Sequence, residues 1–293
     1  MSEEIPAVFR FAPSPNGALH LGHAYSALIN FRMAREVGGR FLLRIEDIDT
    51  ERCRPDYEAQ MLFDLEWLGI EWDEEPRRQS DHFDEYQHAL DDLEAEGLVY
   101  PAFMSRKEIR TVLETWGALW KSDPDGVPHY PGNERSWSKE ECEKEKIARP
   151  QHALRLNMEA AVAHINEPLS WFENGEGPLG ETGKITASPL NWGDVVLGRS
   201  DVPSSYHLSV VLDDALQGVT HVVRGNDLFH ATSVHRLLQE VLKLPVPSYT
   251  HHSLITDDAG RKLSKRDKDT SLTWLREAGC SPEDIFRMVG LED

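Results

Sequence analysis

The sequence has no long apolar run of the kind that crosses a membrane. In its 293 residues, no stretch approaches the roughly 18 consecutive apolar residues of a membrane-spanning helix. The N-terminal segment MSEEIPAVFRF is acidic and short of apolar residues, unlike a secretory signal. We therefore expect a protein that neither spans a membrane nor is exported.

Cysteine is also scarce, and its three copies, Cys53, Cys142 and Cys280, lie far apart in the chain. They form no C-x-C or C-x-x-C pair, which excludes a disulfide scaffold and a cysteine-rich zinc module. Such usage is typical of proteins in a reducing cytoplasm, so we predict a cytoplasmic location.

Positive charge is in short supply. The chain has 31 lysines and arginines against 51 aspartates and glutamates, which gives a formal net charge of −20. Proteins that coat nucleic acid through non-specific electrostatics are expected to be basic. We therefore expect no DNA partner, although a small basic site on an acidic body is compatible with this charge.

The sequence opens with an α/β pattern. Residues 7–13 predict a first strand, the helical spacing from Ala24 predicts a helix that stops at Gly38 and Gly39, and residues 40–47 predict a second strand. A strand, a helix and a strand within about 40 residues form a βαβ unit, which implies a parallel sheet. Two amphipathic helices follow, one from Tyr57 to Leu68 and one from Phe83 to Gly97.

The pattern then changes and later returns. Prolines, glycines and a charged run, KEECEKEK, indicate an inserted region of short elements. The segment SSYHLSVVLDDALQGVTHVVRG predicts two strands around an acidic turn, and helices are expected from Leu228 to Leu244 and in a last stretch to Met288. The predicted division is the first half of a sheet domain at 1–98, an insertion at 99–191, the second half at 192–250, and a basic loop with a helical tail at 251–293.

Two short motifs and a set of charged residues suggest a nucleotide site. His20-Leu21-Gly22-His23 lies where the first strand meets the first helix, and a helix N-terminus attracts phosphate. The basic segment Lys262-Leu263-Ser264-Lys265-Arg266 can neutralise charge on a departing pyrophosphate. Alone, the first motif could be two surface histidines and the second a solvated loop. In an open parallel sheet, ligands bind at the carboxyl ends of the strands, where we expect Arg10, Ser14, Glu46, Tyr206 and Arg224.

Together these segments resemble a known family. RFAPSPNGALHLGH is similar to the first signature of class I aminoacyl-tRNA synthetases of the glutamyl type, and KLSKR resembles their second signature. RIEDIDTER and VVRGNDL are also similar to segments of that family, in the expected order. The resemblance implies a Rossmann-like α/β catalytic domain with a parallel sheet, split by an insertion and followed by a short C-terminal helical segment.

The resemblance also implies roles for individual residues. L-glutamate would be held by Arg10, Ser14, Glu46, Tyr206 and Arg224. ATP, accompanied by Mg²⁺, would be held by Pro13, His20, Gly22, His23, Lys262, Ser264 and Lys265, and the catalytic residues would be His20, His23 and Lys265.

Length narrows this expectation. Full-length glutamyl members of the family have a large helical domain after the second signature that reads the anticodon, whereas here 27 residues follow Arg266, and we expect no anticodon-binding domain. The expected protein is a short member of the family that activates glutamate without tRNA and transfers it to queuosine in the anticodon loop of tRNA(Asp). The alternatives are a truncated synthetase that charges a tRNA 3′ end, a nucleotidyltransferase acting on a small molecule, and a tRNA-binding protein without activity.

One departure from the family concerns zinc. Members often have a zinc site that begins with C-x-C after a tyrosine, but after Tyr100 the corresponding positions are Ala102 and Met104. We predict no structural zinc and expect packing to hold the insertion. The candidate anchors are Trp116, Trp120, Trp137 and Trp171.

Overall fold

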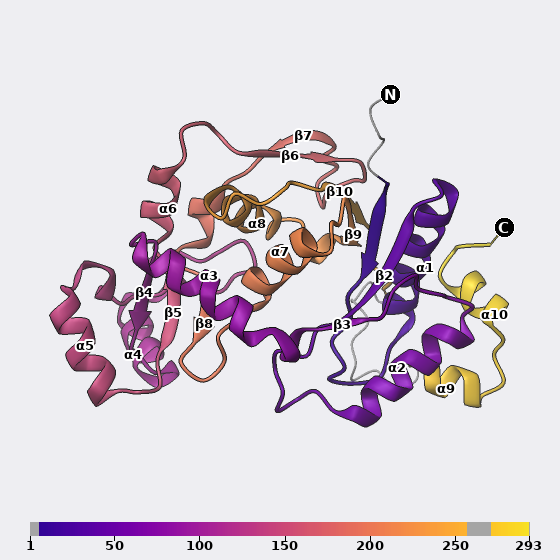
Figure 1. Ribbon diagram of the computed structural model, residues 1–293, viewed down its shortest axis with the longest axis horizontal. Helices are drawn as coiled ribbons and strands as arrows, with labels where there is room; N and C mark the ends of the chain where they lie inside the picture. Colours follow the sequence, from indigo (N-terminus) through magenta and orange to yellow (C-terminus); the bar gives the residue numbers. More distant parts are fainter. Residues whose placement is uncertain (1–5, 257–270, 293) are drawn as a thin grey trace.

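A computed structural model describes residues 6–256 and 271–292 of the chain, and it has an α/β architecture (Figure 1). Within these residues the main sheet has seven strands in the order β3-β2-β1-β9-β10-β6-β7. All neighbouring pairs are parallel except β6 and β7. The strands of this sheet are β1 (Val8–Phe11), β2 (Arg40–Ile45), β3 (Arg77–Arg78), β6 (Ser170–Glu173), β7 (Gly183–Thr186), β9 (His221–Gly225) and β10 (Ser248–His252).

The predicted βαβ unit at the N-terminus is confirmed. Helix α1 (Leu21–Glu36) joins β1 to β2, which pair in parallel with Val8 opposite Arg40. The helix ends before Gly38, whose φ of +63° is a left-handed conformation that glycine adopts without strain. Gly39 lies so close to the preceding strand that a Cβ atom there would be 2.6 Å from the carbonyl oxygen of Ala7. Gly38 and Gly39 therefore allow the tight turn that connects α1 to β2.

The other predicted helices of the main body are also present. The two amphipathic helices predicted after β2 are α2 (Pro55–Trp67) and α3 (Phe83–Ala95). The helix predicted from Leu228 is confirmed as α8 (Thr232–Val241), preceded by a short 3₁₀ turn, η5 (Asn226–Leu228). The helical tail is α9 (Leu272–Glu277) and α10 (Pro282–Met288), and it is tied to α2 by an ion pair between Arg276 and Asp64.

One predicted strand is wrong. The segment expected to form a strand before an acidic turn is a helix, α7 (Tyr206–Leu216). Its aliphatic run packs into the core on more than one side, and its two acidic residues, Asp213 and Asp214, are buried rather than exposed in a turn. A helix buried all round loses the amphipathic period that distinguishes a helix from a strand.

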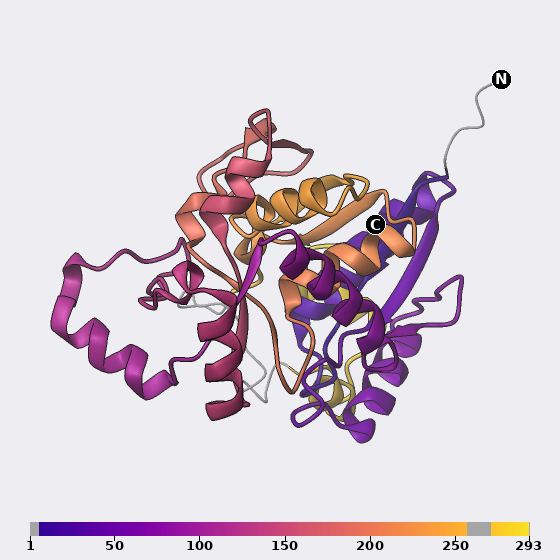
Figure 2. The ribbon, with the colours of Figure 1, turned by 60° about the vertical axis from the view of Figure 1, so that its left-hand side comes forward.

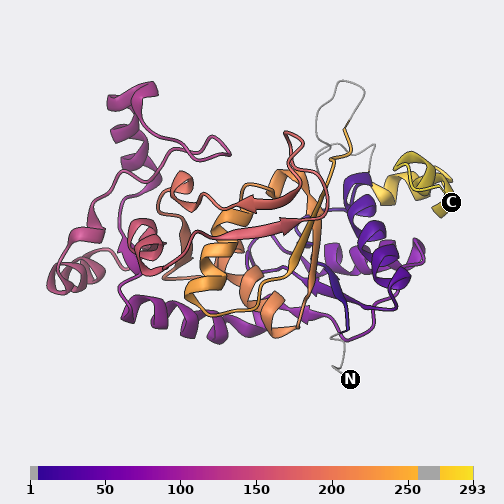
Figure 3. The same cartoon turned by 90° about the horizontal axis from the view of Figure 1, so that it is seen from above.

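The inserted region contributes to two sheets. Strands β4 (Val99–Ala102), β5 (Ala153–Leu156) and β8 (Val196–Arg199) form a separate antiparallel sheet, whereas β6 and β7 join the main sheet. Strands therefore pair across the predicted boundary at 191, and the predicted domain limits stay a prediction. The helices here are α4 (Arg106–Trp116), α5 (Lys139–Ala148) and α6 (Met158–His164). Figure 2 shows α4 standing away from the body, and Figure 3 shows α4 and α5 at the opposite end from α9 and α10.

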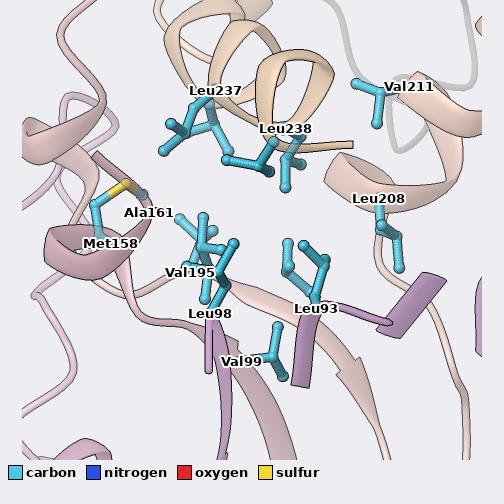
Figure 4. Close-up of a cluster of buried hydrophobic side chains, with 14 of the residues drawn as sticks. Leu93, Leu98, Val99, Met158, Ala161, Val195, Leu208, Val211, Leu237 and Leu238 are labelled. Atoms are coloured by element: carbon cyan, nitrogen blue, oxygen red, sulfur yellow. The ribbon is translucent and has the colours of Figure 1, made fainter. Parts of the chain in front are cut away.

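A shared core attaches the insertion to the main body. Figure 4 shows Leu93 of α3, Val99 of β4, Met158 of α6 and Leu237 of α8 converging in one buried cluster. Each of these four side chains is at most 4% exposed. Burial of this apolar surface makes the insertion part of the same folded unit.

The four tryptophans predicted as anchors of the insertion behave differently. Trp171 is 4% exposed, Trp120 donates a hydrogen bond to the carbonyl oxygen of His129, and Trp137 stacks on Phe103. Trp116 is 54% exposed, so its prediction as a core anchor is wrong. It lies at the end of α4, a helix with no buried residue.

Hydrogen bonds to Glu134 also hold the insertion. The Glu134 carboxylate is 4% exposed and accepts hydrogen bonds from the Tyr130 hydroxyl, at 2.6 Å, and from the Phe103 backbone N–H, at 3.1 Å. The backbone N–H of Met104 donates to the Tyr130 hydroxyl at 3.3 Å. Carboxylate and phenol therefore secure the chain after β4, close to the two positions where the sequence lacks cysteines.

Candidate active site

The predicted site residues that the structure describes line one pocket at the carboxyl ends of β1, β2 and β9. Strand ends, the N-terminus of α1 and the N-terminus of α7 supply them, as the position of a ligand site in an open parallel sheet requires. They are Arg10, Pro13, Ser14, His20, Gly22, His23, Glu46, Tyr206 and Arg224. The remaining predicted residues, Lys262, Ser264 and Lys265, lie outside the described residues.

The HLGH motif forms the N-terminus of α1. His20 is the N-cap residue, and its Nδ1 accepts a hydrogen bond from the Gly22 backbone N–H at 3.1 Å. The Nδ1 of His23 accepts one from the His20 backbone N–H at 3.2 Å, and the centres of the two rings are 3.8 Å apart. When neutral, each ring therefore carries its proton on Nε2, which makes that atom a hydrogen-bond donor. Two imidazole donors at a helix N-terminus suit an anionic ligand such as phosphate.

Two of the arginines near the pocket share one carboxylate. Asp214 accepts hydrogen bonds from Arg10 Nε at 3.0 Å and from Arg44 Nη1 at 2.8 Å. Burial alone would raise the pKa of Asp214, but the two guanidinium groups outweigh it and lower the pKa. Asp214 is therefore ionised and balances part of the charge that the arginines bring into the pocket.

Glu46 has a different electrostatic environment. Its carboxylate lies 3.3 Å from Arg44 Nη2 and faces the pocket from the end of β2. Burial raises the pKa of Glu46 to about 7, against the opposing effect of Arg44 and Arg10, with Asp214 adding to the increase. Its charge therefore changes near neutral pH, and a cationic group placed beside it would favour the ionised form.

Arg224 faces the same pocket from β9. It donates hydrogen bonds from Nη1 to the Tyr206 hydroxyl, at 3.4 Å, and from Nη2 to Thr232 Oγ1, at 2.8 Å. The contacts of its guanidinium in the described chain are with neutral groups, including a ring nitrogen of His251 at 3.1 Å from Nε. A buried guanidinium of this kind is suited to bind a carboxylate.

Sequence reasoning missed several residues around this pocket. Arg44 is the first residue of the RIEDIDTER segment but was given no role, and Asp214 lies outside the predicted motifs, 204 residues from its partner Arg10. His252 lines the pocket and packs edge-to-face against Tyr25, and its Nε2 is buried without a hydrogen-bond partner. The only sequence signal for Asp214 was the acidic pair in DDAL, which was interpreted as a turn.

A family model described as tRNA synthetases class I (E and Q), catalytic domain, matches residues 7–292. The chain belongs to this family. The family resemblance and the fold class predicted from the sequence are therefore confirmed, and the strand order agrees with them. The HLGH turn described above lies within the matched catalytic domain.

Individual relatives of this synthetase-family chain agree with the family match. A glutamyl-Q tRNA(Asp) synthetase of Rhodobacter capsulatus is 48% identical over 285 residues, which cover 97% of this chain and 100% of the relative. One from Symbiobacterium thermophilum is 39% identical and covers 94% of this chain and 83% of the relative. The crystal structure of a glutamate-tRNA synthetase from Elizabethkingia anophelis is similar at a TM-score of 0.80 and 28% identity, over 98% of this chain. This chain spans 61% of that protein's length.

The described residues contain neither a cluster of metal ligands nor a membrane-spanning helix. Within residues 6–256 and 271–292, no group of three or more His, Cys, Asp or Glu side chains could hold a metal ion. The absence of structural zinc stays a prediction. Across the same residues, every helix is too short or too polar to cross a bilayer.

Proposed function

We propose that this protein activates L-glutamate with ATP and transfers the glutamyl group to queuosine in the anticodon loop of tRNA(Asp). The observation that carries the proposal is the pocket, in which two buried arginines, Arg10 and Arg224, meet the N-terminus of α1. The relative named glutamyl-Q tRNA(Asp) synthetase, 48% identical and matched over its full length, supports the choice of acceptor. The cytoplasmic location predicted from cysteine usage remains part of this proposal.

In this proposal the pocket recognises glutamate through its side-chain carboxylate and its α-ammonium group. Arg224 and Arg10 bind the side-chain carboxylate, with hydrogen bonds from Tyr206 and Ser14. Glu46, whose pKa burial raises to about 7, binds the α-ammonium in its ionised form. The contacts of Arg224, Arg10 and Glu46 use a charge opposite to that of the substrate group, which gives both affinity and orientation.

ATP enters as its Mg²⁺ complex and lies over the N-terminus of α1. The Nε2 protons of His20 and His23 bind phosphate oxygens, and Lys265 neutralises the departing pyrophosphate. The α-carboxylate of glutamate then attacks the α-phosphorus, and pyrophosphate leaves to give glutamyl-adenylate. No enzyme nucleophile is needed, because the carboxylate is already charged. The protein contributes positioning and electrostatic stabilisation.

In the second step a hydroxyl of the queuosine cyclopentene ring attacks the carbonyl carbon of the adenylate. An ester forms, AMP leaves with the bonding electron pair, and the proton of the hydroxyl is released to solvent. Because the first step needs only glutamate and ATP in this proposal, pyrophosphate exchange should proceed without tRNA.

The decisive experiment supplies labelled glutamate and ATP with tRNA from two sources, cells that make queuosine and cells that cannot. We expect label only in the queuosine-containing tRNA. Glutamate–tRNA ligases are also relatives, for example one from Prochlorococcus marinus that is 35% identical over 96% of this chain, although this chain covers 57% of that ligase. Equal labelling of both pools would therefore mean charging of the tRNA 3′ end and would overturn the proposed acceptor.

A further inference from the structure

Behind the pocket, three buried side chains from neighbouring strands lie in a row. Glu173 ends β6, His251 belongs to β10, and Arg224 belongs to β9. Their exposed fractions are 1%, 2% and 5%. Only Arg224 reaches the pocket and belongs to a predicted motif. The row therefore connects β6 of the main sheet to the site through residues far apart in sequence.

The hydrogen bonds in this row have only one possible direction. Arg224 Nε can only donate, so His251 Nε2, at 3.1 Å, must accept. The proton of the His251 ring therefore lies on Nδ1, which donates to Glu173 Oε2 at 2.6 Å. Glu173 Oε1 accepts from the backbone N–H of His251, at 2.7 Å, and from that of Gly175, at 3.0 Å. Together with a bond from Trp171 Nε1 at 3.3 Å, the carboxylate accepts four N–H groups.

A second row of hydrogen bonds, through His235 and His207, holds the other side of the Arg224 guanidinium. Arg224 Nη1 lies 3.1 Å from His235 Nδ1, which must accept its proton. His235 Nε2 then donates to His207 Nδ1 at 3.2 Å. The guanidinium of Arg224 is thus held from two directions by neutral imidazole rings rather than by carboxylates.

This arrangement differs from that of the other arginine in the pocket. Arg10 contacts Asp214 directly, so a carboxylate of the protein itself compensates its charge. Arg224 has an imidazole between its guanidinium and Glu173. A carboxylate in direct contact with Arg224 would compete with the substrate carboxylate for the guanidinium. A neutral imidazole can orient the guanidinium without neutralising its charge.

We propose that Glu173 is a positioning residue, which fixes Arg224 through His251 so that its guanidinium stays directed at the substrate carboxylate. The inference rests on the proposed function, because it names a residue that acts on glutamate recognition at the same pocket. Glu173 makes no contact with the pocket itself, and its effect passes through the His251 ring.

The protonation of the surrounding groups supports this assignment. Burial lowers the pKa of His251 to about 4, with Arg224 adding to the effect and Glu173 opposing it. Burial and Arg224 also lower the pKa of His207 to about 4 and that of His235 well below its ordinary value. The hydrogen bonds from His251 lower the pKa of Glu173 despite its burial. At neutral pH the rings are therefore uncharged and Glu173 is ionised, as the hydrogen-bond directions require.

The test replaces the carboxylate by an amide in Glu173→Gln. Glutamine offers one acceptor oxygen where glutamate offers two, so one of its N–H groups must face a donor of His251 or Gly175. In glutamate-dependent ATP–pyrophosphate exchange we expect the KM for glutamate to rise about tenfold, the loss expected for a hydrogen bond to a charged group. We expect the KM for ATP to change by less than about twofold, since ATP does not contact Arg224 in the proposed arrangement.

Two further variants separate positioning from a general loss of structure. Glu176→Gln makes the same change at an exposed position of the same hairpin and should leave both KM values unchanged. In an Arg224→Gln background, Glu173→Gln should raise the KM for glutamate no further, because the group it orients is gone. A selective and non-additive effect would support the inference.

Other outcomes would overturn it. The positioning role would be rejected if Glu173→Gln had an unchanged KM for glutamate, or if its KM values for glutamate and ATP rose equally. The proposed function would stay intact in both cases, provided that the wild-type protein catalyses glutamate-dependent exchange. Absence of glutamate-dependent exchange in the wild type would instead reject the proposed function, and this inference with it. If the variant does not fold, ¹⁵N NMR of the wild-type protein decides: His251 must carry its proton on Nδ1, and a proton on Nε2 at neutral pH would refute the proposal.

Discussion

The charge of Glu46 provides a quantitative test of glutamate recognition through pH. Burial raises the pKa of this carboxyl to about 7. A group with that pKa is about nine-tenths ionised at pH 8, half ionised at pH 7 and one-tenth ionised at pH 6. Since only the carboxylate form attracts the α-ammonium, kcat/KM for glutamate should fall about tenfold between pH 8 and pH 6.

The direction of this effect follows from the groups that face Glu46. Arg44, with its raised pKa, stays protonated throughout this range, and Asp214, with its lowered pKa, stays ionised. Bound glutamate places its ammonium beside Glu46 and favours the ionised form, so kcat should keep its value to lower pH than kcat/KM does.

The assay is ATP–pyrophosphate exchange measured from pH 6 to pH 8 with glutamate varied and ATP saturating. Glu46→Gln is the matched variant, because it keeps the shape of the side chain and every other titrating group. We expect the variant to have a lower kcat/KM at pH 8 and a profile without this tenfold slope. An identical slope in both proteins would refute the assignment of the titration to Glu46.

Four other changes test separate parts of the structure. Asp214→Asn removes the buried carboxylate that Arg10 and Arg44 share, and the free energy of unfolding should fall by about 3–5 kcal/mol; a drop below about 1 kcal/mol in urea denaturation would contradict the ion-pair network. Glu134→Ala leaves two donors of the insertion unsatisfied and should cost about 1–3 kcal/mol, measured in the same way, with glutamate-dependent exchange retained. Lys265→Ala should lower kcat for adenylate formation by about two to three orders of magnitude, and an unchanged rate would remove its proposed role. Arg10→Ala should raise the KM for glutamate and weaken discrimination against glutamine, and an unaltered KM would reject that contact.

Much of the fold could be predicted because many of its helices and strands follow from the pattern of neighbouring residues. The apolar alternation, the two glycines after α1 and the helical spacing of α2 and α3 are all properties of neighbouring residues. The same reasoning failed for α7, where the aliphatic run is buried on several sides and the acidic pair is buried by arginines that come from other strands. The partners that decide the state of Asp214 are 170 and 204 residues away, beyond any local pattern.

The candidate site shows the same division. The strand-end rule and the HLGH turn predicted which residues would meet, and all those that the structure describes line one pocket. The residues behind them were not predicted. Glu173 was placed inside the insertion by composition, yet β6 pairs in the main sheet and brings it to His251. Local composition carries no information about which sheet a strand joins.

Arg10 and Arg224 were both predicted as pocket residues, but their different contacts could not be predicted from the sequence. From sequence, Arg10 and Arg224 are equivalent cations at the ends of β1 and β9. In the folded chain Arg10 contacts Asp214, which also holds Arg44, so much of its charge is used to join β1 and β2 to α7. Arg224 is surrounded by neutral acceptors and keeps its charge for a ligand. We therefore propose that selection of a carboxylate over an amide depends more on Arg224, because a neutral ligand would leave this buried cation without a counter-charge.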